Sequence, residues 1–255
     1  MEICDLSNTA KIIWQSVGVT LVAVLLVGAV VWGLMMRPMD VPCKSLEYII
    51  EDRAERMYLT EGELTRVLET EGVYPVGKAL NRGSLHKIES VIRRHPMVRT
   101  AECYLTPWQV MKVRLTQRVP LLRVQTPGDT YFVDTDRRIM PVREAVKDQV
   151  LVAKGAVGVQ MASGPLVEFA QWLENDNYWK PRVHHVYVQN PRMVYVYLKG
   201  DGLQVSGERI LLGSMHGFES KLAKCRTFFE NGQEALKDKQ YKEYDLRFNG
   251  QVVAR

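Results

Sequence analysis

The first pattern along the chain is an apolar run over residues 12–36 that contains no ionisable side chain and ends at Arg37. About 20 apolar residues in a helix cross a hydrocarbon core of ~30 Å. Trp14 and Trp32 lie near the two ends of the run, where indole rings prefer the membrane interface. The pattern therefore predicts a single transmembrane helix over residues 12–36, preceded by a short tail over residues 1–11.

A cleaved signal peptide is the competing interpretation of this run. Its apolar core is usually ~7–15 residues long and is followed by small residues at a cleavage site. Here the run is longer, and it ends in Met35-Met36 before Arg37-Pro38 rather than in small residues, so we favour an uncleaved anchor. Positive residues occur on both flanks, and the positive-inside rule leaves the orientation open.

The region after the run begins with strand and helix signals. Residues 44–51 alternate as a half-buried strand. Thr60 and Glu63 have the spacing of a capping box, and Leu59 with Leu64 occupy the two positions of a hydrophobic staple. We therefore expect a helix to begin at this point and to end near a glycine at position 72.

A second helix and two strands complete this region. The second helix is predicted over residues 84–95, because Pro96 disfavours helical geometry in the residue before it. Strands are predicted over 97–105 and 109–117, where apolar and polar residues alternate in the second. The predicted order over residues 37–118 is β-α-α-β-β, with both helices on one face of a sheet.

From residue 119 the pattern changes to short β-like runs separated by turn residues. The predicted strands are 121–125, 130–134, 150–154, 183–189, 193–199, 203–206 and 209–212. Two helices are predicted, over 163–175 and 217–231. Tyr244, Leu246 and Phe248 share one face of a final strand that precedes an Asn249-Gly250 turn. The fold class is therefore α+β, with a second, mostly antiparallel β domain over residues 119–255.

Composition changes this picture little. The net charge of +5 is mild; it fits an acidic partner or an anionic surface, or simply an ordinary solvated face, and it does not indicate nucleic acid binding. None of the four cysteines forms a C-x-x-C pair, and buried single thiols are favoured over a disulfide. The composition and cysteine spacing thus point to no metal and no cofactor.

No catalytic signature is present in the chain. His184 and His185 are neighbours in a predicted strand, so we expect their side chains to point to opposite faces and to share no metal. Asp134 and Asp136 could be a carboxylate pair, but the adjacent Arg137 and Arg138 favour a charge-neutralised hairpin turn. The sequence therefore predicts a protein that is not an enzyme.

The last predicted strand is the candidate site. A strand at the end of a sheet that pairs on only one side offers free N–H and C=O groups to an extended partner. Phe248 and Val252 could supply apolar anchors, while Arg247 and Gln251 would discourage nonspecific pairing. The strand could equally lie inside the sheet and serve only the fold. The sequence physics leaves both possibilities open.

Several patches resemble passages of one bacterial family. They are His95 to Ala101, Gln117 to Pro120, Phe132 to Asp134 with Met140-Pro141, Gly207 with Arg209 to Gly213, Lys221-Leu222, and Tyr244 to Val252. In this order they resemble the FtsQ/DivIB family of cell-division proteins, and the resemblance covers nearly the whole chain. Two departures are Gln117, where the family has Glu, and Arg137, where the hairpin of the family has Gly.

The resemblance implies a division scaffold in the bacterial inner membrane. By that likeness, residues 1–11 are cytoplasmic, a POTRA domain (37–118) and a β domain (119–255) are periplasmic, and the protein acts at the septum. The partners implied are the small bitopic proteins FtsB and FtsL and, indirectly, the septal synthase pair FtsW and FtsI. The implied contact residues are Arg247, Phe248, Asn249, Gly250 and Val252 on the last strand, with Lys221 and Lys224 on the preceding helix.

Two rival functions remain. A membrane-anchored POTRA protein of secretion or outer-membrane assembly would carry tandem POTRA units or a barrel. An anchored wall-active enzyme would need a cleft with a nucleophile or a carboxylate pair. The sequence displays neither feature.

Overall fold

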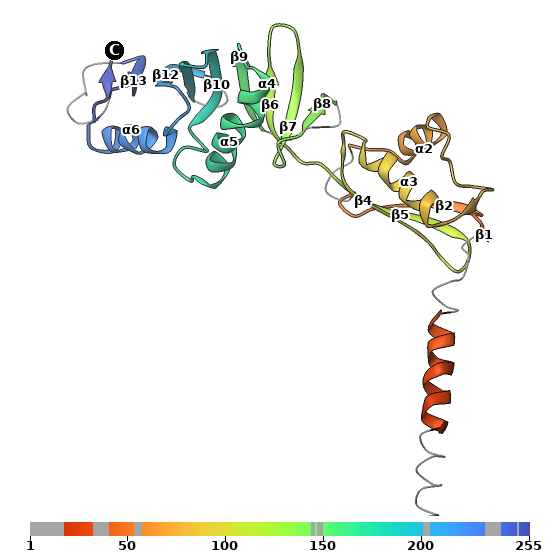
Figure 1. Ribbon diagram of the computed structural model, residues 1–255. Coiled ribbons are helices and arrows are strands. Elements are labelled where there is room, and N and C mark those ends of the chain that lie inside the picture. The colour runs from red at the N-terminus through yellow and green to blue at the C-terminus, as the bar shows by residue number, and fades with distance from the viewer. Residues whose placement is uncertain are drawn as a thin grey trace, which may run out of the picture.

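The computed structural model describes residues 18–32, 41–53, 58–143, 146, 150–200, 205–232, 241–248 and 250–255. It is a mixed α+β structure in which a helix is followed by two globular regions (Figure 1). We call the elements β1 to β5 the N-terminal region and the elements β6 to β14 the C-terminal region.

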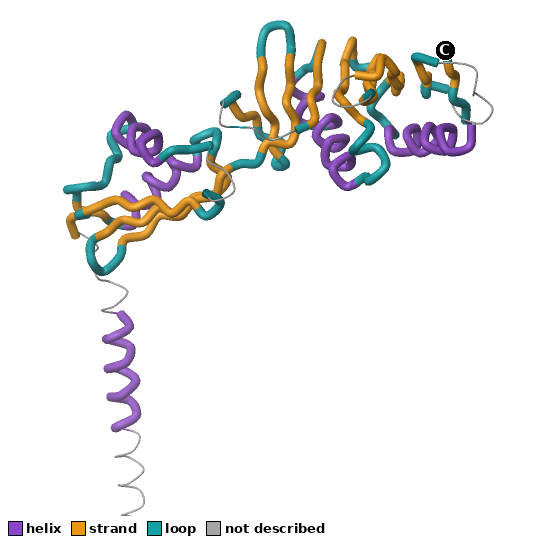
Figure 2. Tube along the Cα trace, turned by 180° about the vertical axis from the view of Figure 1, so that it is seen from behind, coloured by secondary structure: helices purple, strands orange, loops and turns teal. Residues whose placement is uncertain are grey.

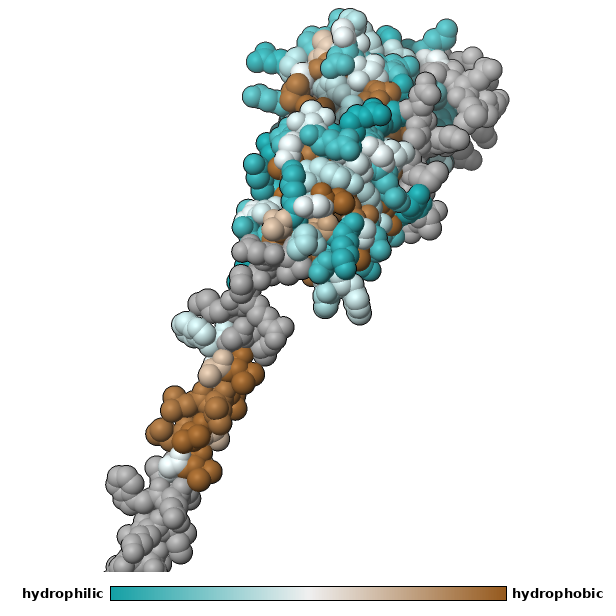
Figure 3. Space-filling model, turned by 90° about the vertical axis from the view of Figure 1, so that its right-hand side faces the viewer, coloured by the Kyte–Doolittle hydropathy of each residue, from teal (hydrophilic) through white to brown (hydrophobic). Residues whose placement is uncertain are grey.

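Residues 18–32 form a helix with exposed side chains. The helix is apolar along its whole described length (Figure 3). Within the described residues, no helix is both long enough and apolar enough to span a membrane. The rest of the predicted span, residues 12–17 and 33–36, lies outside the described residues, as does the predicted tail over 1–11.

The N-terminal region is built on a three-stranded sheet with the order β2-β5-β4. Its strands are β2 (Ser45–Ile50), parallel to β5 (Val110–Gln117), and β4 (Val98–Leu105), antiparallel to β5. Helices α2 (Glu61–Thr70) and α3 (Arg82–Arg93) bury their apolar residues against it. The predicted β-α-α-β-β order is confirmed. The structure adds a two-residue pair, β1 (Val41–Pro42) with β3 (Ala79–Leu80).

The helix starts refine the sequence prediction. Thr60 is the N-cap of α2, and its hydroxyl accepts a hydrogen bond from the Glu63 N–H at 3.3 Å. In a full capping box the Glu63 carboxylate would accept a hydrogen bond from the Thr60 N–H. Here that carboxylate contacts His95 and, in the C-terminal region, Arg143. Helix α3 starts two residues before the predicted Ser84, because Asn81 is its cap and accepts the Ser84 N–H at 2.8 Å.

The C-terminal region is a nine-stranded sheet with the order β14-β13-β12-β11-β10-β9-β6-β7-β8. Its strands are β6 (Pro120–Gln125), β7 (Thr130–Asp134), β8 (Ile139–Pro141), β9 (Leu151–Gly155), β10 (Val183–Asn190), β11 (Met193–Lys199), β12 (Val205–Gly213), β13 (Glu243–Asp245) and β14 (Val253–Ala254). The pairs β6–β9, β9–β10 and β12–β13 are parallel, and the other pairs are antiparallel. Residues 205–206 and 209–212 of the two predicted strands belong to one strand, β12, and residues 203–204 lie outside the described residues. Strand β8 was not predicted.

Three helices pack on one face of this sheet, where the sequence predicted two (Figure 2). They are α4 (Val159–Ser163), α5 (Pro165–Asn175) and α6 (Phe218–Gly232). The added helix, α4, is separated from α5 by Gly164, whose backbone leaves the helical range at φ −113° and ψ −104° just before Pro165. A residue that precedes proline is disfavoured in the helical conformation, so α4 and α5 are separate helices. The helix predicted over 163–175 corresponds to α5, and α4 was not predicted.

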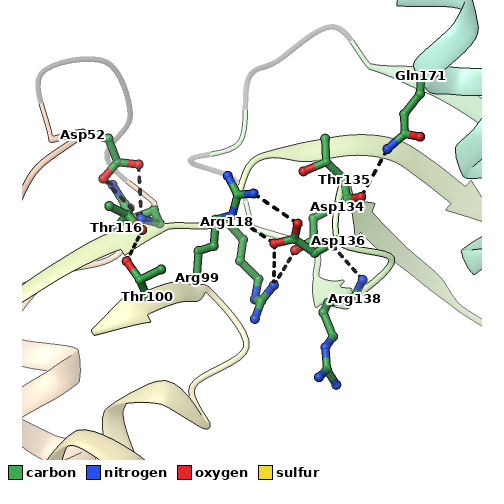
Figure 4. A network of polar contacts seen from close by, with 11 residues as sticks. Asp52, Arg99, Thr100, Thr116, Arg118, Asp134, Thr135, Asp136, Arg138 and Gln171 are labelled. Atoms are coloured by element: carbon green, nitrogen blue, oxygen red, sulfur yellow. Dashed lines mark hydrogen bonds and ion pairs between the residues drawn. The ribbon is translucent and has the colours of Figure 1, made fainter. Parts of the chain in front are cut away.

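The two regions share a charged junction (Figure 4). Arg118 donates to Asp134 at 2.6 Å, and Arg99 of β4 binds Asp136 through two hydrogen bonds of 2.9 and 3.1 Å. The turn that carries both carboxylates includes Arg137 at φ 64°, a left-handed residue where the family has glycine. The predicted neutralised turn is confirmed, although Arg118 and Arg99 provide the cations rather than Arg137 and Arg138.

The apolar core of the N-terminal region also extends across this junction. Phe132 of β7 and Met140 of β8 are buried in the same cluster as Leu64, Ile92 and Val113. The C-terminal region therefore completes the core of its neighbour.

Candidate partner-binding edge

The strand that carries Tyr244 is not the edge of the sheet. β13 pairs with β12 on one side, in parallel, and with β14 on the other side, antiparallel. Tyr244 and Leu246 are buried in the core, whereas Phe248 is 47% exposed and does not share their face. The prediction of one final strand over these residues is wrong, because the chain turns back near Gly250 and adds a further strand.

The edge is β14, and its register shows which groups are free. Arg255 and Glu243 exchange two backbone hydrogen bonds, of 2.9 and 3.1 Å. Bonded and non-bonded pairs alternate along an antiparallel ladder. Val253, which pairs with Asp245, therefore also faces β13, while the N–H and C=O groups of Ala254 point away from the sheet. In the part of the chain that the structure describes, no strand pairs with that outer side.

Two other sheet edges are obstructed. Beside β4, the Cys103 N–H donates to the Glu89 carboxylate at 3.3 Å, and the Ala101 C=O accepts from Arg93 at 3.0 Å. Glu89 and Arg93 are paired with each other at 3.1 Å on α3, so this helix occupies the free ladder groups of β4. At the far end of the large sheet, β8 is three residues long and ends at Pro141. Short strands and proline discourage pairing there.

The turn into β14 is fixed by a buried carboxylate. Asp245 is fully buried, and Arg247 donates to it from Nε at 3.0 Å and from Nη2 at 2.7 Å. Arg255 adds a third contact at 3.3 Å. The hydrogen bonds from Arg247 hold the pKa of Asp245 below its ordinary value. A Cβ on Gly213 would lie 2.8 Å from Cγ of Arg247, so a glycine at this position leaves room for the arginine.

The structure distributes the predicted contact residues unevenly. Phe248 and Gly250 lie exposed in the turn, where Gly250 has φ 76°, and Val252 is half-buried against the core just before β14. Arg247 lies beside them, but Asp245 engages its guanidinium. Asn249 lies outside the described residues.

The two lysines of α6 differ in role. Lys221 donates from Nζ to the carbonyl groups of Leu212 at 3.0 Å and Ser214 at 2.8 Å, so it ties α6 to the end of β12. Burial lowers its pKa, and the nearby Lys224 adds to that effect. Lys224 itself is exposed. Lys221 is thus engaged within the fold, and only Lys224 presents its ammonium group to solvent.

Sequence reasoning missed an aromatic surface on the helix-free face of β10, β11 and β12, which are separated from β14 by β13. The ring of His185 stacks on Tyr197 at 4.6 Å, and the guanidinium of Arg209 lies 5.1 Å from the ring of Tyr195. Arg209 also pairs with Glu243 of β13 at 2.7 Å, which joins this surface to the strand beside the edge. The signal was available, because tyrosines at 195 and 197 alternate with buried valines along β11.

The two adjacent histidines do not point apart as predicted. Their Nδ1 atoms are 2.8 Å apart, because a register shift between Val183 and His185 breaks the strict alternation of β10. Within the described residues, no group of three or more histidine, cysteine or acidic side chains is arranged to hold a metal.

The described cysteines have no disulfide partners. Cys43, Cys103 and Cys225 are free thiols. Burial raises the pKa of Cys103 and of Cys225 to about 12. Thiols of this kind are inert, because the thiolate is the reactive form.

Comparison with known proteins agrees with this architecture. Residues 119–255 match the family model described as FtsQ/DivIB, C-terminal related, and residues 41–116 match a POTRA-like domain. A search of curated proteins found no match. The first match covers more than half of the chain and includes every strand of the large sheet. The chain therefore belongs to the FtsQ/DivIB family, whose members are non-catalytic proteins of bacterial cell division.

Proposed function

We propose that this protein is a membrane-anchored division scaffold that binds an extended segment of an FtsB-like or FtsL-like bitopic protein along the outer side of β14. Through that partner it links to the septal synthase, which is FtsW/FtsI-like. The observation that carries the proposal is the open outer side of β14 at the end of the nine-stranded sheet, where the backbone groups of Ala254 face away from β13. Val252 lies just before this strand. An incoming strand would satisfy the backbone groups of Ala254 by β-augmentation.

The surroundings of β14 support the same mode of binding. Phe248 is an exposed aromatic side chain beside the ladder, and large aromatic residues are frequent anchors at protein interfaces. Arg247 contributes indirectly, because its pairing with Asp245 fixes the turn from which β14 starts. The predicted contacts at Asn249, Gly250, Lys221 and Lys224 remain part of the proposal.

Membrane attachment is the second part of the proposal. The apolar run over residues 12–36 would be the anchor, residues 1–11 the cytoplasmic tail, and regions 37–118 and 119–255 the periplasmic domains of a protein at the septum. The support is the absence of ionisable side chains from that run and the exposed, apolar helix over residues 18–32. This anchor would hold β14 on the same side of the membrane as the periplasmic segments of bitopic partners.

Ala254→Pro tests the open edge. The backbone N–H of Ala254 faces away from β13, so proline at this position removes one outward donor and places its ring on the binding side. We expect at least about a tenfold loss of affinity for the periplasmic segment of the FtsB-like partner, measured by titration against the purified full chain. Phe248→Glu should weaken the same binding, because it places a charge at the anchor position.

Two matched variants separate binding from folding. Ala254→Ser keeps the backbone donor and should bind as the parent does. Ile139→Glu is the control for Phe248→Glu, because Ile139 is 43% exposed and Phe248 is 47% exposed. Ile139 lies at the opposite end of the sheet, so this variant should leave binding unchanged. Parent-like affinity in a folded Ala254→Pro protein would remove β14 as the docking edge.

A further inference from the structure

The turn between β4 and β5 displays the most exposed large apolar side chain among the described residues. Trp108 is 77% exposed, whereas Trp179 in the C-terminal core is 1% exposed. The turn is well ordered by hydrogen bonds, from the Gln109 N–H to the Thr106 C=O at 3.0 Å and from the Val110 N–H to the Thr106 hydroxyl at 3.1 Å. Gln109 has φ 68°, which is uncommon outside glycine. A defined turn therefore presents the indole ring to its surroundings.

The same turn is bound to the chain segment that follows the apolar run. The Lys44 N–H donates to the Gln109 C=O at 2.8 Å, and β2 begins beside the start of β5 (Figure 1). A chain spans at most ~3.5 Å per residue, so the eight residues from Arg37 to Lys44 reach no further than ~28 Å. Covalent geometry therefore keeps Trp108 near the end of the apolar run.

Two exposed cations lie at this end of the N-terminal region. Lys44 is exposed in the segment that contacts the turn. Lys78 is exposed next to it, where the Cys43 N–H donates to its carbonyl group at 3.0 Å, and its Nζ donates to the Gly72 C=O at 3.1 Å, which leaves two of its three N–H donors for other partners. Indole rings favour the interfacial zone of a bilayer, and lysines near an anchor interact with anionic headgroups. The exposed tryptophan and the two lysines thus lie on segments that are hydrogen-bonded to each other through residues 43 and 44, which follow the proposed anchor along the chain.

We propose that Trp108 inserts into the interfacial zone of the bilayer and forms a second attachment point for the N-terminal region. This inference rests on the proposed membrane anchor. A single indole ring binds a membrane weakly by itself. Attachment through the anchor makes the second contact intramolecular, and the high effective concentration compensates for the weak affinity. Two attachment points would restrict the tilt of the N-terminal region relative to the membrane.

Lipid quenching of tryptophan emission tests the proposal on the full chain. The parent for this experiment carries Trp14→Phe and Trp32→Phe, which removes the indole rings of the apolar run. It is reconstituted in nanodiscs of phosphatidylcholine and phosphatidylglycerol, with or without lipid brominated near the headgroup. The difference in emission between this parent and the same protein with Trp108→Phe is the emission of Trp108. We expect brominated lipid to reduce this component about twofold or more, because the ring lies at the depth of the bromines.

A control tryptophan shows whether quenching is specific to the turn. Val159→Trp in the Trp108→Phe background places an indole ring at another exposed apolar position, 57% exposed at the start of α4. This ring should keep its emission in brominated lipid. Unquenched, solvent-like emission from Trp108 in a reconstituted chain would overturn the inference and favour a protein ligand. If the chain is not retained in nanodiscs, the anchor itself is wrong, which is a separate and distinguishable failure.

Discussion

At the residue scale, Asp245 shows why a predicted contact residue can have a structural role. Its carboxylate is fully buried, and two arginines from either side of the final turn bind it. The sequence identified Arg247 as a candidate contact residue on the last predicted strand. It did not identify Asp245 as the acidic partner that accepts the hydrogen bonds of its guanidinium. A local sequence pattern does not specify which of several nearby charges becomes buried.

Arg247→Ala should therefore act first on stability. The substitution leaves a buried carboxylate with the longer contact from Arg255, and breaking a buried pair is costly. Because Arg247 is 39% exposed and is partly solvated, we expect a discounted loss of about 1–2 kcal/mol in the free energy of unfolding. Denaturant titration of Arg247→Ala and of the exposed Lys224→Ala measures the difference. Equal stability of the two variants would contradict a structural role for Arg247.

His185 gives the protein a pH dependence with a definite sign. Burial, followed by the nearby charge of Lys154 and by His184, lowers its pKa from 6.5 to about 4. Below pH ~6.5 the unfolded chain binds a proton that the folded chain rejects, so the stability contributed by this residue falls between pH 6.5 and pH 4. Above pH 6.5 the contribution is fully present.

His185→Phe tests that assignment. Phenylalanine keeps an aromatic ring against Tyr197 but cannot titrate. Free energies of unfolding measured at several values between pH 7 and pH 4 should decline less steeply in the variant than in the parent. His95, whose pKa burial also lowers, remains in both proteins and therefore cancels in the comparison. Parallel curves for the two proteins would reject the assignment to His185.

At the element scale, the sequence predicted best where periodicity and caps agree. The helix at Thr60 and the strand with Met111, Val113 and Leu115 buried on one face were confirmed, because each pattern extends over several residues. Two-residue strands such as β1 and β3 have no measurable period. The short helix α4, which ends before Gly164, and the bulge at His185 also have no extended pattern, and both were missed.

The edge of the large sheet could not be obtained from local pattern either. Tyr244 and Leu246 were correctly read as sharing a face, and both are buried. Which strand lies outermost depends on whether the chain returns after Gly250 to pair again. That return depends on tertiary packing, and β14 is only two residues long, which is too short to give a hydrophobic pattern in the sequence. The predicted final strand is thus replaced by β13 and β14, while the partner-binding role of this end of the sheet stays a prediction.

At the scale of the whole molecule, the two regions are joined by more than the strand connection at Arg118. The Glu63 carboxylate, at the start of α2, binds the guanidinium of Arg143 in the C-terminal region, with one contact at 2.9 Å, and His95 Nε2 lies 3.2 Å away. The Met97 N–H donates to His95 Nδ1 at 3.3 Å, which leaves the ring proton on Nε2 to be donated to Glu63.

Electrostatics favours the charged form of Glu63 at this contact. Burial alone would raise its pKa, but the hydrogen bonds and charge of Arg143, with His95, hold the pKa below its ordinary value. Burial lowers the pKa of His95 below its ordinary value, against the opposing effect of Glu63 and with Arg143 acting in the same direction as burial, so the neutral imidazole is favoured. The contact is thus a carboxylate and guanidinium pair supported by a neutral histidine.

The Glu63–Arg143 pair should couple the two regions energetically. We expect Glu63→Gln and Arg143→Ala each to lower the free energy of unfolding, and the double variant to lose less than the sum of the single changes. A coupling energy of about 1 kcal/mol is expected, since both side chains remain roughly one quarter exposed. Additive losses would show that the pair does not connect the regions. Phe132 and Met140 complete the core of the N-terminal region. If the Glu63–Arg143 pair is coupled as well, both contacts hold the two regions together, and the orientation of β14 relative to the proposed anchor depends on the whole molecule.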